Sequence, residues 1–266
     1  MAAEELSWVP DDVDLSKPNA ARVYDYFLGG ANNFDVDRVF ARKLTEILPD
    51  APFLAIENRS FLRRAVKFVA EQGVRQFIDL GSGIPTVGNT HEIAQLVDPD
   101  VKVVYVDFEA VAVAHSQLIL ADVPNAEIVR ADFRTPDTVL SDPTVREMID
   151  FSRPVGILMF SSVHFISDDD RPEDIVAAFR DVTVPGSYLA LSHATNDGRP
   201  EVADAVAEYK NAANSAYVRT KEQVSGFFDG YDLVEPGIVY TAEWRAELEV
   251  PDPWRAGAYA GVGVKR

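Results

Sequence analysis

Phe77-Ile78-Asp79-Leu80-Gly81-Ser82-Gly83-Ile84-Pro85-Thr86 places a Gly-x-Gly turn directly after a short apolar run. Gly81 permits a tight turn, and Gly83 lets a ligand approach the backbone closely. The N-terminus of the following helix favours a negatively charged group. The pattern therefore predicts that Gly81, Ser82 and Gly83 bind a cofactor, although an ordinary strand-to-helix loop can also look like this.

Acidic residues end the next two predicted strands. Asp107 lies 26 positions after Gly81, where a carboxylate can accept hydrogen bonds from both hydroxyls of a ribose. Asp132 follows the third strand and can accept from an adenine amino group, with Phe133 beside the ring; Phe108 is assigned to the same site. Each acid alone is typical of a turn. Together, the strand ends predict a nucleoside-type ligand at one edge of the sheet.

The glycine turn also bears on which nucleoside binds. A dinucleotide fingerprint has a third glycine for close packing of helix against strand. Here Pro85-Thr86 takes that place, and the next glycine is Gly88. The turn thus lacks the usual seat for a pyrophosphate, which favours S-adenosylmethionine over NAD.

From the first predicted strand onward, strand and helix patterns alternate. This alternation predicts an α/β fold, with a doubly wound, mostly parallel sheet and an antiparallel closing strand. The predicted strands are 76–80, 101–106, 126–130, 155–160, 187–192, 231–235 and 257–264, and the helices between them are 91–97, 111–120, 172–180 and 201–213.

The segment before the first strand reads as helical. Ser16-Lys17-Pro18 suits a helix start, a second helix begins near Asp35, and a third spans about 53–72. We predict that residues 1–73 form an N-terminal arm and a helical cap, packed on the same domain as a cofactor-binding unit over residues 74–266.

Charge and composition exclude several classes of function. The chain has 266 residues and a net charge of −18, from 25 Lys and Arg against 43 Asp and Glu. Such a charge repels phosphate backbones and anionic lipid, so we expect neither a nucleic-acid nor a membrane partner. Cysteine is absent, which excludes disulfides and thiolate zinc, and we expect no metal. With an acidic N-terminus and no long apolar run, the sequence predicts a cytoplasmic protein.

One N-terminal block is distinctive enough to suggest a family. Pro18–Gly30, which contains Ala-Arg-Val-Tyr-Asp-Tyr-Phe-Leu-Gly-Gly, resembles the signature of a bacterial family of S-adenosylmethionine-dependent methyltransferases, long described as a domain of unknown function. The resemblance implies a class I methyltransferase fold with S-adenosylmethionine as cofactor, but names no methyl acceptor. Similar stretches extend over nearly the whole chain: Asn33-Phe34, 57–59, 79–86, 105–107, 185–189, 191–193 and 235–237.

Two histidines are candidates for the chemistry. His164 and His193 follow the fourth and fifth strands, and ligands of open α/β sheets bind beyond the carboxyl ends of the strands. Each histidine either acts on the methyl acceptor during catalysis or only holds a loop in place by packing or hydrogen bonding. His91 and His115 fall within predicted helices and are interpreted as structural. The acidic run at Asp168–Asp170 is interpreted as a helix N-terminus.

The cap helices supply further candidates. Tyr24 shares the apolar face of its helix, which leaves Tyr26 as a candidate catalytic residue and Arg22 as a candidate cofactor contact. Arg59 suits the carboxylate of the methionine moiety, because a guanidinium can bind it through two hydrogen bonds, or else pairs with an acid on the surface. Ser161 is assigned to the cofactor and not to nucleophilic catalysis, because the glycines of a nucleophile elbow are absent.

The sequence leaves the function open at several points. We favour a methyltransferase that acts on a small molecule. A non-catalytic module that binds S-adenosylmethionine and an NAD(P)-dependent oxidoreductase are the alternatives. Neither the methylated atom nor the oligomeric state follows from the residues.

Overall fold

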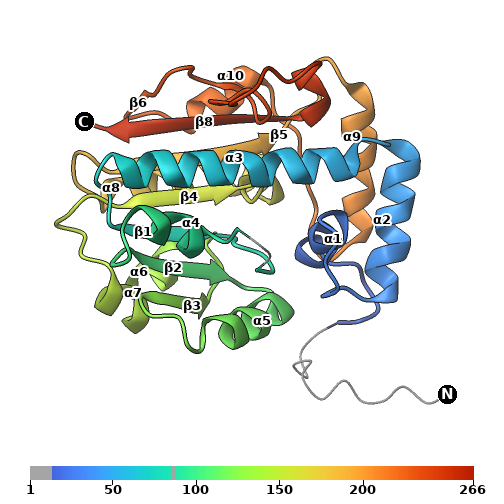
Figure 1. The fold of residues 1–266 in the computed structure, drawn as a ribbon. Helices are drawn as coiled ribbons and strands as arrows, with labels where there is room; N and C mark the ends of the chain where they lie inside the picture. The colour runs from blue at the N-terminus through green and yellow to red at the C-terminus, as the bar shows by residue number, and fades with distance from the viewer. Residues whose placement is uncertain (1–13, 86–87) are drawn as a thin grey trace, which may run out of the picture.

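The computed structural model describes residues 14–85 and 88–266, and its centre is one twisted sheet (Figure 1). Within these residues the sheet has eight strands in the order β3-β2-β1-β4-β5-β8-β6, and β7 also pairs with β8. The bounds are β1 Gln76–Leu80, β2 Lys102–Asp107, β3 Ala126–Arg130, β4 Gly156–Phe160, β5 Tyr188–Ala194, β6 Tyr231–Leu233, β7 Val239–Tyr240 and β8 Ala258–Lys265.

The direction of the strands confirms the predicted fold class. Strands β1 to β5 pair in parallel, β8 runs antiparallel to β5, and β6 and β7 run antiparallel to β8. The chain reverses its direction of travel across the sheet between β1 and β4, which is where ligands bind in open α/β sheets. The short strand β7 was not predicted, because two residues carry no periodic signal.

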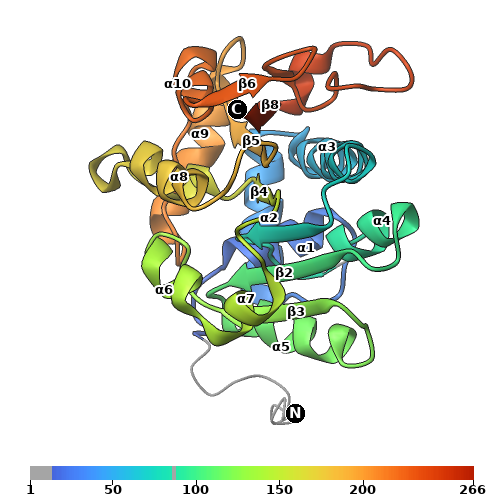
Figure 2. The same cartoon turned by 90° about the vertical axis from the view of Figure 1, so that its left-hand side faces the viewer.

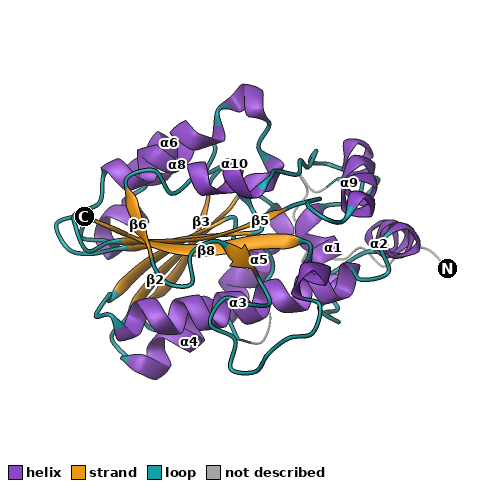
Figure 3. Ribbon diagram, turned by 90° about the horizontal axis from the view of Figure 1, so that it is seen from above, coloured by secondary structure: helices purple, strands orange, loops and turns teal. Residues whose placement is uncertain are grey.

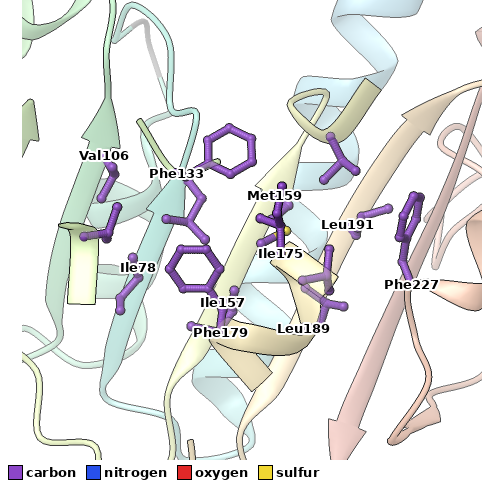
Figure 4. Packing of buried hydrophobic residues seen from close by; sticks show 14 of the residues in the cluster. Ile78, Val106, Phe133, Ile157, Met159, Ile175, Phe179, Leu189, Leu191 and Phe227 are labelled. Atoms are coloured by element: carbon purple, nitrogen blue, oxygen red, sulfur yellow. The ribbon is translucent and has the colours of Figure 1, made fainter. Parts of the chain in front are cut away.

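The central strands are buried on both faces, as their continuous apolar runs predict. Ile78 and Ile157 face one hydrophobic cluster, whereas Phe77 and Leu158 face another on the opposite side of the sheet. Figure 4 shows the first cluster, in which Phe179 of the flanking helix packs on the strands. At about 25 cal/mol per Å² of buried apolar surface, these two clusters are the main stabilising contribution to the fold.

Helices cover both faces of the sheet (Figures 2 and 3). Side chains of α3, α4 and α5 enter the cluster on one face, and side chains of α6, α7, α8 and α10 enter the other. These helices span α3 Ala51–Glu71, α4 Thr90–Val97, α5 Ala110–Leu120, α6 Pro136–Ser141, α7 Pro143–Met148, α8 Pro172–Asp181 and α10 Lys221–Gly226; short 3₁₀ turns are η1 Val163–Phe165, η2 Asp168–Asp170, η3 Glu208–Asn211 and η4 Pro253–Ala256.

The remaining helices gather beyond the carboxyl ends of the parallel strands, at the right of Figure 1. They are α1 Ala20–Phe27, α2 Asp35–Ile47 and α9 Pro200–Ala207, and they share one hydrophobic cluster with the start of α3. We call α1, α2, α9 and η3 the cap. Helix α9 follows β5, so the cap also contains a segment from outside residues 1–73. The helix predicted over 201–213 ends at Ala207 and tightens into η3.

Helix α1 begins later than predicted. Its N-cap is Asn19, whose side-chain oxygen accepts a hydrogen bond from the backbone N–H of Ala21. Ser16 instead donates to Asp14 in a turn before the helix. Asparagine caps at least as well as serine, so Asn19 takes this role and the helix starts one residue after it.

Helix α3 connects the cap to the sheet. Its first turns carry Ala51 and Leu54 of the cap cluster, whereas Phe61, Val66 and Val69 pack on the sheet. Helix α3 therefore packs against both the cap helices and the sheet. Although α3 has 21 residues, neither it nor any other helix of the described chain is long and apolar enough to cross a membrane.

A buried ion pair joins the cap to α5. The Arg22 guanidinium, 2% exposed, donates to Asp37 at 2.8 Å and to Glu109 at 3.2 Å. It also donates to the carbonyl oxygen of Lys17. Glu109 in turn caps α5 by accepting from the N–H of Ala112. Arg22 thus connects α1, α2 and α5 through charges that water does not screen.

We expect Arg22→Met to lower the free energy of unfolding by about 3 kcal/mol, because it leaves two buried carboxylates without their cation. Urea unfolding followed by circular dichroism measures this. Lys67→Met is the control, since the exposed Lys67 pairs with the exposed Glu71 and its loss changes stability by less than about 1 kcal/mol. Equal midpoints for the two variants would contradict the stabilising role of the buried pair.

Candidate functional site

A cavity lies between the carboxyl ends of the strands and the cap. Loops after β1, β2, β3 and β4 line one wall, and α1, the first half of α3 and η3 line the other. The predicted residues Gly81, Ser82, Gly83, Asp107, Phe108, Asp132, Phe133, Ser161, Arg59 and His164 all line this cavity. Arg22, Tyr26 and His193 are not among its lining residues.

The glycine turn forms the floor of the cavity at the point where the strand order reverses. Gly81 has φ +72°, and a Cβ added to it would lie 2.6 Å from Cβ of Ser162. Gly83 has φ +67°, and a Cβ there would meet nothing within 4 Å. Glycine is therefore required at position 81 by the close approach of two loops, and at position 83 by the backbone conformation.

Asp107 ends β2 beneath this turn. Its Oδ2 accepts from the N–H of Gly83 at 2.7 Å, and its Oδ1 accepts from the N–H of Glu109 at 2.9 Å. Burial raises the pKa of this carboxyl, while those backbone donors lower it. Each carboxylate oxygen has a second lone pair, so Asp107 can still accept hydrogen bonds from a ligand.

Residues that follow β2 and β3 line a partly exposed part of the cavity. Arg134 binds Asp132 through two nitrogens, at 2.9 and 2.6 Å, and its guanidinium lies 5.6 Å from the ring centre of Phe108. Phe108 is 40% exposed at the mouth, whereas Phe133 is 6% exposed and extends into the core beneath (Figure 4). This part of the cavity can therefore stack a planar ring between apolar and cationic surfaces.

The sequence reasoning missed Asp79, which lines the same cavity from β1. Asp79 is 4% exposed, and its Oδ2 accepts from the Thr90 hydroxyl at 2.6 Å. Burial raises its pKa to about 6, with the charge of Arg59 opposing that rise. The available signal was a charged residue inside the apolar run Phe77–Leu80, because a buried carboxylate is costly unless a partner is present.

Several polar atoms in the cavity wall are buried without a hydrogen-bond partner among the described residues. They are Nε of Arg59, Oγ of Ser82, Oγ of Ser162 and Nδ1 of His164. Orphaned buried polar atoms are rare in folded proteins and need an explanation. A polar ligand that spans the glycine turn and the end of β4 would satisfy them. Ser161, between these points, has φ +51°.

His164 and His193 lie side by side but in different surroundings. Their rings are 5.7 Å apart, and only His164 lines the cavity. His193 is fully buried: its Nδ1–H donates to the carbonyl of Ala194 at 2.8 Å, and its Nε2 accepts from Arg219 at 2.7 Å. Burial and the Arg219 charge lower the pKa of His164 to about 3. Both imidazoles are therefore neutral at physiological pH.

Of the polar residues considered on α1, Tyr24 lines the cavity, whereas Arg22 and Tyr26 do not. The Tyr24 hydroxyl donates to the carbonyl of Ala55 at 3.0 Å and accepts from Asn58 at 2.9 Å. Arg22 is held by the ion pair with α2 and α5, and Tyr26 packs against the cap cluster. Helical spacing alone allows either side of α1 to face the cavity. The orientation of α1 is set by packing of its apolar side chains in the cap cluster.

Asn58 extends this contact to the sheet. It also accepts from the Ser192 hydroxyl, and Ser192 Oγ accepts from the N–H of Ser161 at 2.9 Å. A chain of hydrogen bonds therefore runs from α1 through α3 to β5 and the end of β4. Asn58 is 4% exposed, so water does not compete for these bonds.

The other titratable groups singled out in the sequence have structural surroundings. His91 bonds the Tyr105 hydroxyl through both its backbone N–H and Nδ1, and His115 lies on α5 beside the charge of Asp25. Asp168 pairs with Arg219 at 2.6 Å, next to the N-terminus of α8. Across residues 14–85 and 88–266, no group of three or more His, Asp or Glu side chains is placed to hold a metal ion.

The charges in the cavity favour a cation. Asp79, Asp107, Glu109 and Asp132 line it, together with Arg59 and Arg134. Acids thus outnumber arginines there. S-adenosylmethionine carries a sulfonium and an ammonium against one carboxylate, whereas NAD carries a pyrophosphate, which these acids would repel.

Comparison with known proteins agrees with this geometry. A family model described as S-adenosyl methyltransferase matches residues 6–266. The chain belongs to this family. The enzyme is therefore a methyltransferase, and its cofactor is S-adenosylmethionine, as the glycine turn predicted. The family resemblance and the α/β fold class predicted from the sequence are likewise confirmed.

Solved structures extend the comparison over the whole chain. A candidate methyltransferase from Thermobifida fusca is 41% identical, with a TM-score of 0.92 and full coverage of both chains. A DUF574 family protein from Streptomyces avermitilis is 35% identical over 94% of this chain and 98% of that one, with a TM-score of 0.91. Human N-acetylserotonin methyltransferase in complex with SAM shares the fold alone, at 13% identity, 94% and 63% coverage and a TM-score of 0.51. No curated protein matches the sequence.

We expect Asn58→Ala to lower the free energy of unfolding by about 2 kcal/mol, because it leaves the buried Ser192 hydroxyl without its acceptor. Chemical denaturation checks this value. Ser60→Ala is the control on the same helix: the exposed Ser60 hydroxyl bonds only the carbonyl of Ile56, and its removal changes stability by less than about 0.5 kcal/mol. An Asn58→Ala protein as stable as the wild type would show that the chain of hydrogen bonds does not hold the cap.

Proposed function

We propose that the enzyme transfers the methyl group of S-adenosylmethionine to a small molecule bound between the cofactor and the cap. The observation that carries this proposal is the cavity itself, which the cap covers directly over the switch point between β1 and β4. A net charge of −18 disfavours nucleic acid as the acceptor. The absence of cysteine supports action in the cytoplasm.

In this proposal the cofactor's methionine end lies at the glycine turn. Asp79 accepts from the ammonium group, and Arg59 donates to the carboxylate through its orphaned Nε. Ser82 and Ser162, whose hydroxyls also lack partners, complete the contacts. Gly83 leaves its side of the backbone open to the ligand. These assignments satisfy three of the four orphaned atoms in the cavity wall.

The nucleoside end lies over β2 and β3. Asp107 accepts from the two ribose hydroxyls, using lone pairs that Gly83 and Glu109 leave free. Asp132 accepts from the adenine amino group, and the ring stacks between Phe108 and the apolar surface near Phe133. Arg22 contributes indirectly, because it fixes Glu109 and the start of α5.

The cofactor supplies an activated methyl group, so the protein's main task is to position the acceptor in line with it. His164 stands at the end of β4, near the switch point, and its neutral ring can accept a hydrogen bond from the acceptor. His193 and Arg219 support the loop that carries His164: Arg219 also donates to the carbonyl of Ile166 at 2.8 Å. We assign them a positioning role.

Asp107→Ala tests the proposal. We expect it to weaken binding of S-adenosylhomocysteine by at least about 100-fold, because two hydrogen bonds to a charged acceptor are lost. Calorimetric titration measures the affinity. Asp98→Ala is the control: Asp98 pairs with Arg75 at the opposite end of the sheet, and its loss leaves the affinity unchanged. Wild-type affinity in a folded Asp107→Ala protein would rule out the ribose assignment.

The pKa of Asp79 predicts a pH dependence. Binding of the ammonium group requires an ionised Asp79, and burial holds its pKa at about 6 in the free protein. We therefore expect the affinity for S-adenosylhomocysteine to fall as the pH drops below about 6, by up to about tenfold per pH unit. Asp79→Asn should bind about 10- to 100-fold more weakly at pH 7.5 and lose this pH dependence.

The same carboxyl gives an independent check on stability. Its folded pKa is raised above its unfolded value of 3.8, so the ligand-free protein loses stability as the pH rises from about 4 through about 6. At pH 7.5 the ligand-free Asp79→Asn protein should therefore melt at a higher temperature than the wild type. A lower melting temperature would mean that Asp79 serves the fold and not the ligand.

A further inference from the structure

Charged side chains occupy only one half of the cavity. The lining acids Asp79, Asp107 and Asp132 end β1, β2 and β3, Glu109 begins α5, and Arg59 and Arg134 face these acids. The other half lies beyond β4, β5 and β8 and beneath the cap. We call it the acceptor half and define it by Phe27, Leu54, Phe160, Phe165, Ile166 and Tyr209.

Aromatic rings from separate elements build the acceptor half. Phe165 of η1 and Tyr209 of η3 have ring centres 5.8 Å apart at 60°. The Phe165 ring lies 4.4 Å from the ring of His164. Gly257 lies just before β8. A Cβ added to it would lie 2.9 Å from Cδ2 of Leu54, so a side chain there would crowd this half of the cavity. The result is an apolar recess with ring edges and faces exposed to it, which suits a planar ring.

The polar groups of this half are all neutral. Among its described lining residues they are His164, the hydroxyl of Tyr209 and the amide of Asn214; Tyr24 and Asn58 lie at its border, where the Arg59 guanidinium is 5.9 Å from the Tyr24 ring centre. The carboxylates of the cavity lie on the cofactor half, and Nδ1 of His164 is buried without a partner, so no acid raises the basicity of His164. The neutral ring of His164 can accept a hydrogen bond, but it carries no positive charge that would stabilise an anion.

A charged acceptor would lose its hydration here without gaining a counter-ion. Burying an unpaired carboxylate or ammonium is strongly unfavourable. Of the lining arginines, Arg59 is already assigned to the cofactor's carboxylate and Arg134 pairs with Asp132. The acceptor half therefore selects against acids, phosphates and protonated amines.

We propose that the methyl acceptor is an uncharged, planar aromatic molecule whose nucleophilic atom is a hydroxyl oxygen or amine nitrogen that donates a hydrogen bond to His164. This inference rests on the proposed function. In the transfer, the acceptor's oxygen or nitrogen forms a bond to the methyl carbon while the carbon–sulfur bond breaks. The electron pair of that bond stays on sulfur, and the acceptor's proton is released to water.

The test uses the full-length protein saturated with S-adenosylhomocysteine. Four probes share one ring system: 1-naphthol, 1-naphthylamine, 1-methoxynaphthalene and 1-naphthoate. We expect the naphthol or the naphthylamine to bind, the methoxy compound to bind several-fold more weakly because it lacks a donor, and the naphthoate to bind at least about 100-fold more weakly. The tighter of the first two identifies the hydroxyl or the amine as the preferred nucleophile.

Phe165→Ala locates the bound probe. Loss of the ring should weaken probe binding by about tenfold or more and leave binding of S-adenosylhomocysteine unchanged. Phe53→Ala is the matched control, because Phe53 is a half-buried phenylalanine that does not line the cavity. Phe165→Leu, which keeps an apolar side chain, replaces Phe165→Ala if that variant fails to fold, with the same direction expected.

The outcomes separate the two levels of the proposal. Failure of the wild type to bind S-adenosylhomocysteine would overturn the cofactor assignments and this inference with them. Cofactor binding without binding of either donor probe, or naphthoate binding as tightly as naphthol, would overturn the acceptor class alone. If the Phe165 and Phe53 variants bound the probe equally well, the probe would not bind in the acceptor half.

Discussion

The close approach of Gly81 to Ser162 is the constraint on which the site depends. It brings the loop after β1 against the loop after β4 at the point where the strand order reverses. A side chain at position 81 would force these loops apart. With glycine there, the carboxyl ends of β1, β2 and β3 form one side of the cavity and the ends of β4 and β5 the other. The separation of the cavity into a cofactor half and an acceptor half follows from this geometry.

Buried polar contacts, and not hydrophobic packing alone, fix the cap over that edge. Arg22 connects α1 to α2 and α5, and Asn58 connects α1 and α3 to β5. Because these contacts are buried and directional, they specify one position of the cap, whereas an apolar interface tolerates sliding. Helix α3 adds a rigid connection, since its two halves belong to the cap cluster and to the sheet cluster.

The distribution of charge explains how one cavity can serve two different ligands. The cofactor half pairs a cationic ligand with an excess of carboxylates, and Asp79 is buried there at a cost in stability that the Thr90 hydroxyl and the charge of Arg59 offset only in part. The acceptor half offers neutral polar atoms and aromatic surface. Proteins commonly trade stability for function in this way, and a buried carboxylate at a strand end is a direct sign of it.

The sequence by itself determined the α/β fold class, the cofactor and which residues end the strands, because these depend on local patterns: apolar runs, the Gly81-x-Gly83 turn and acids after strands. Only the tertiary structure decided which side of α1 lines the cavity, which of the two histidines lines it, and that α9 belongs to the cap. Helical periodicity gives the spacing of Arg22, Tyr24 and Tyr26 but not the direction of the partner. That direction is set by contacts distant in sequence, such as Asp37, Asn58 and Arg219.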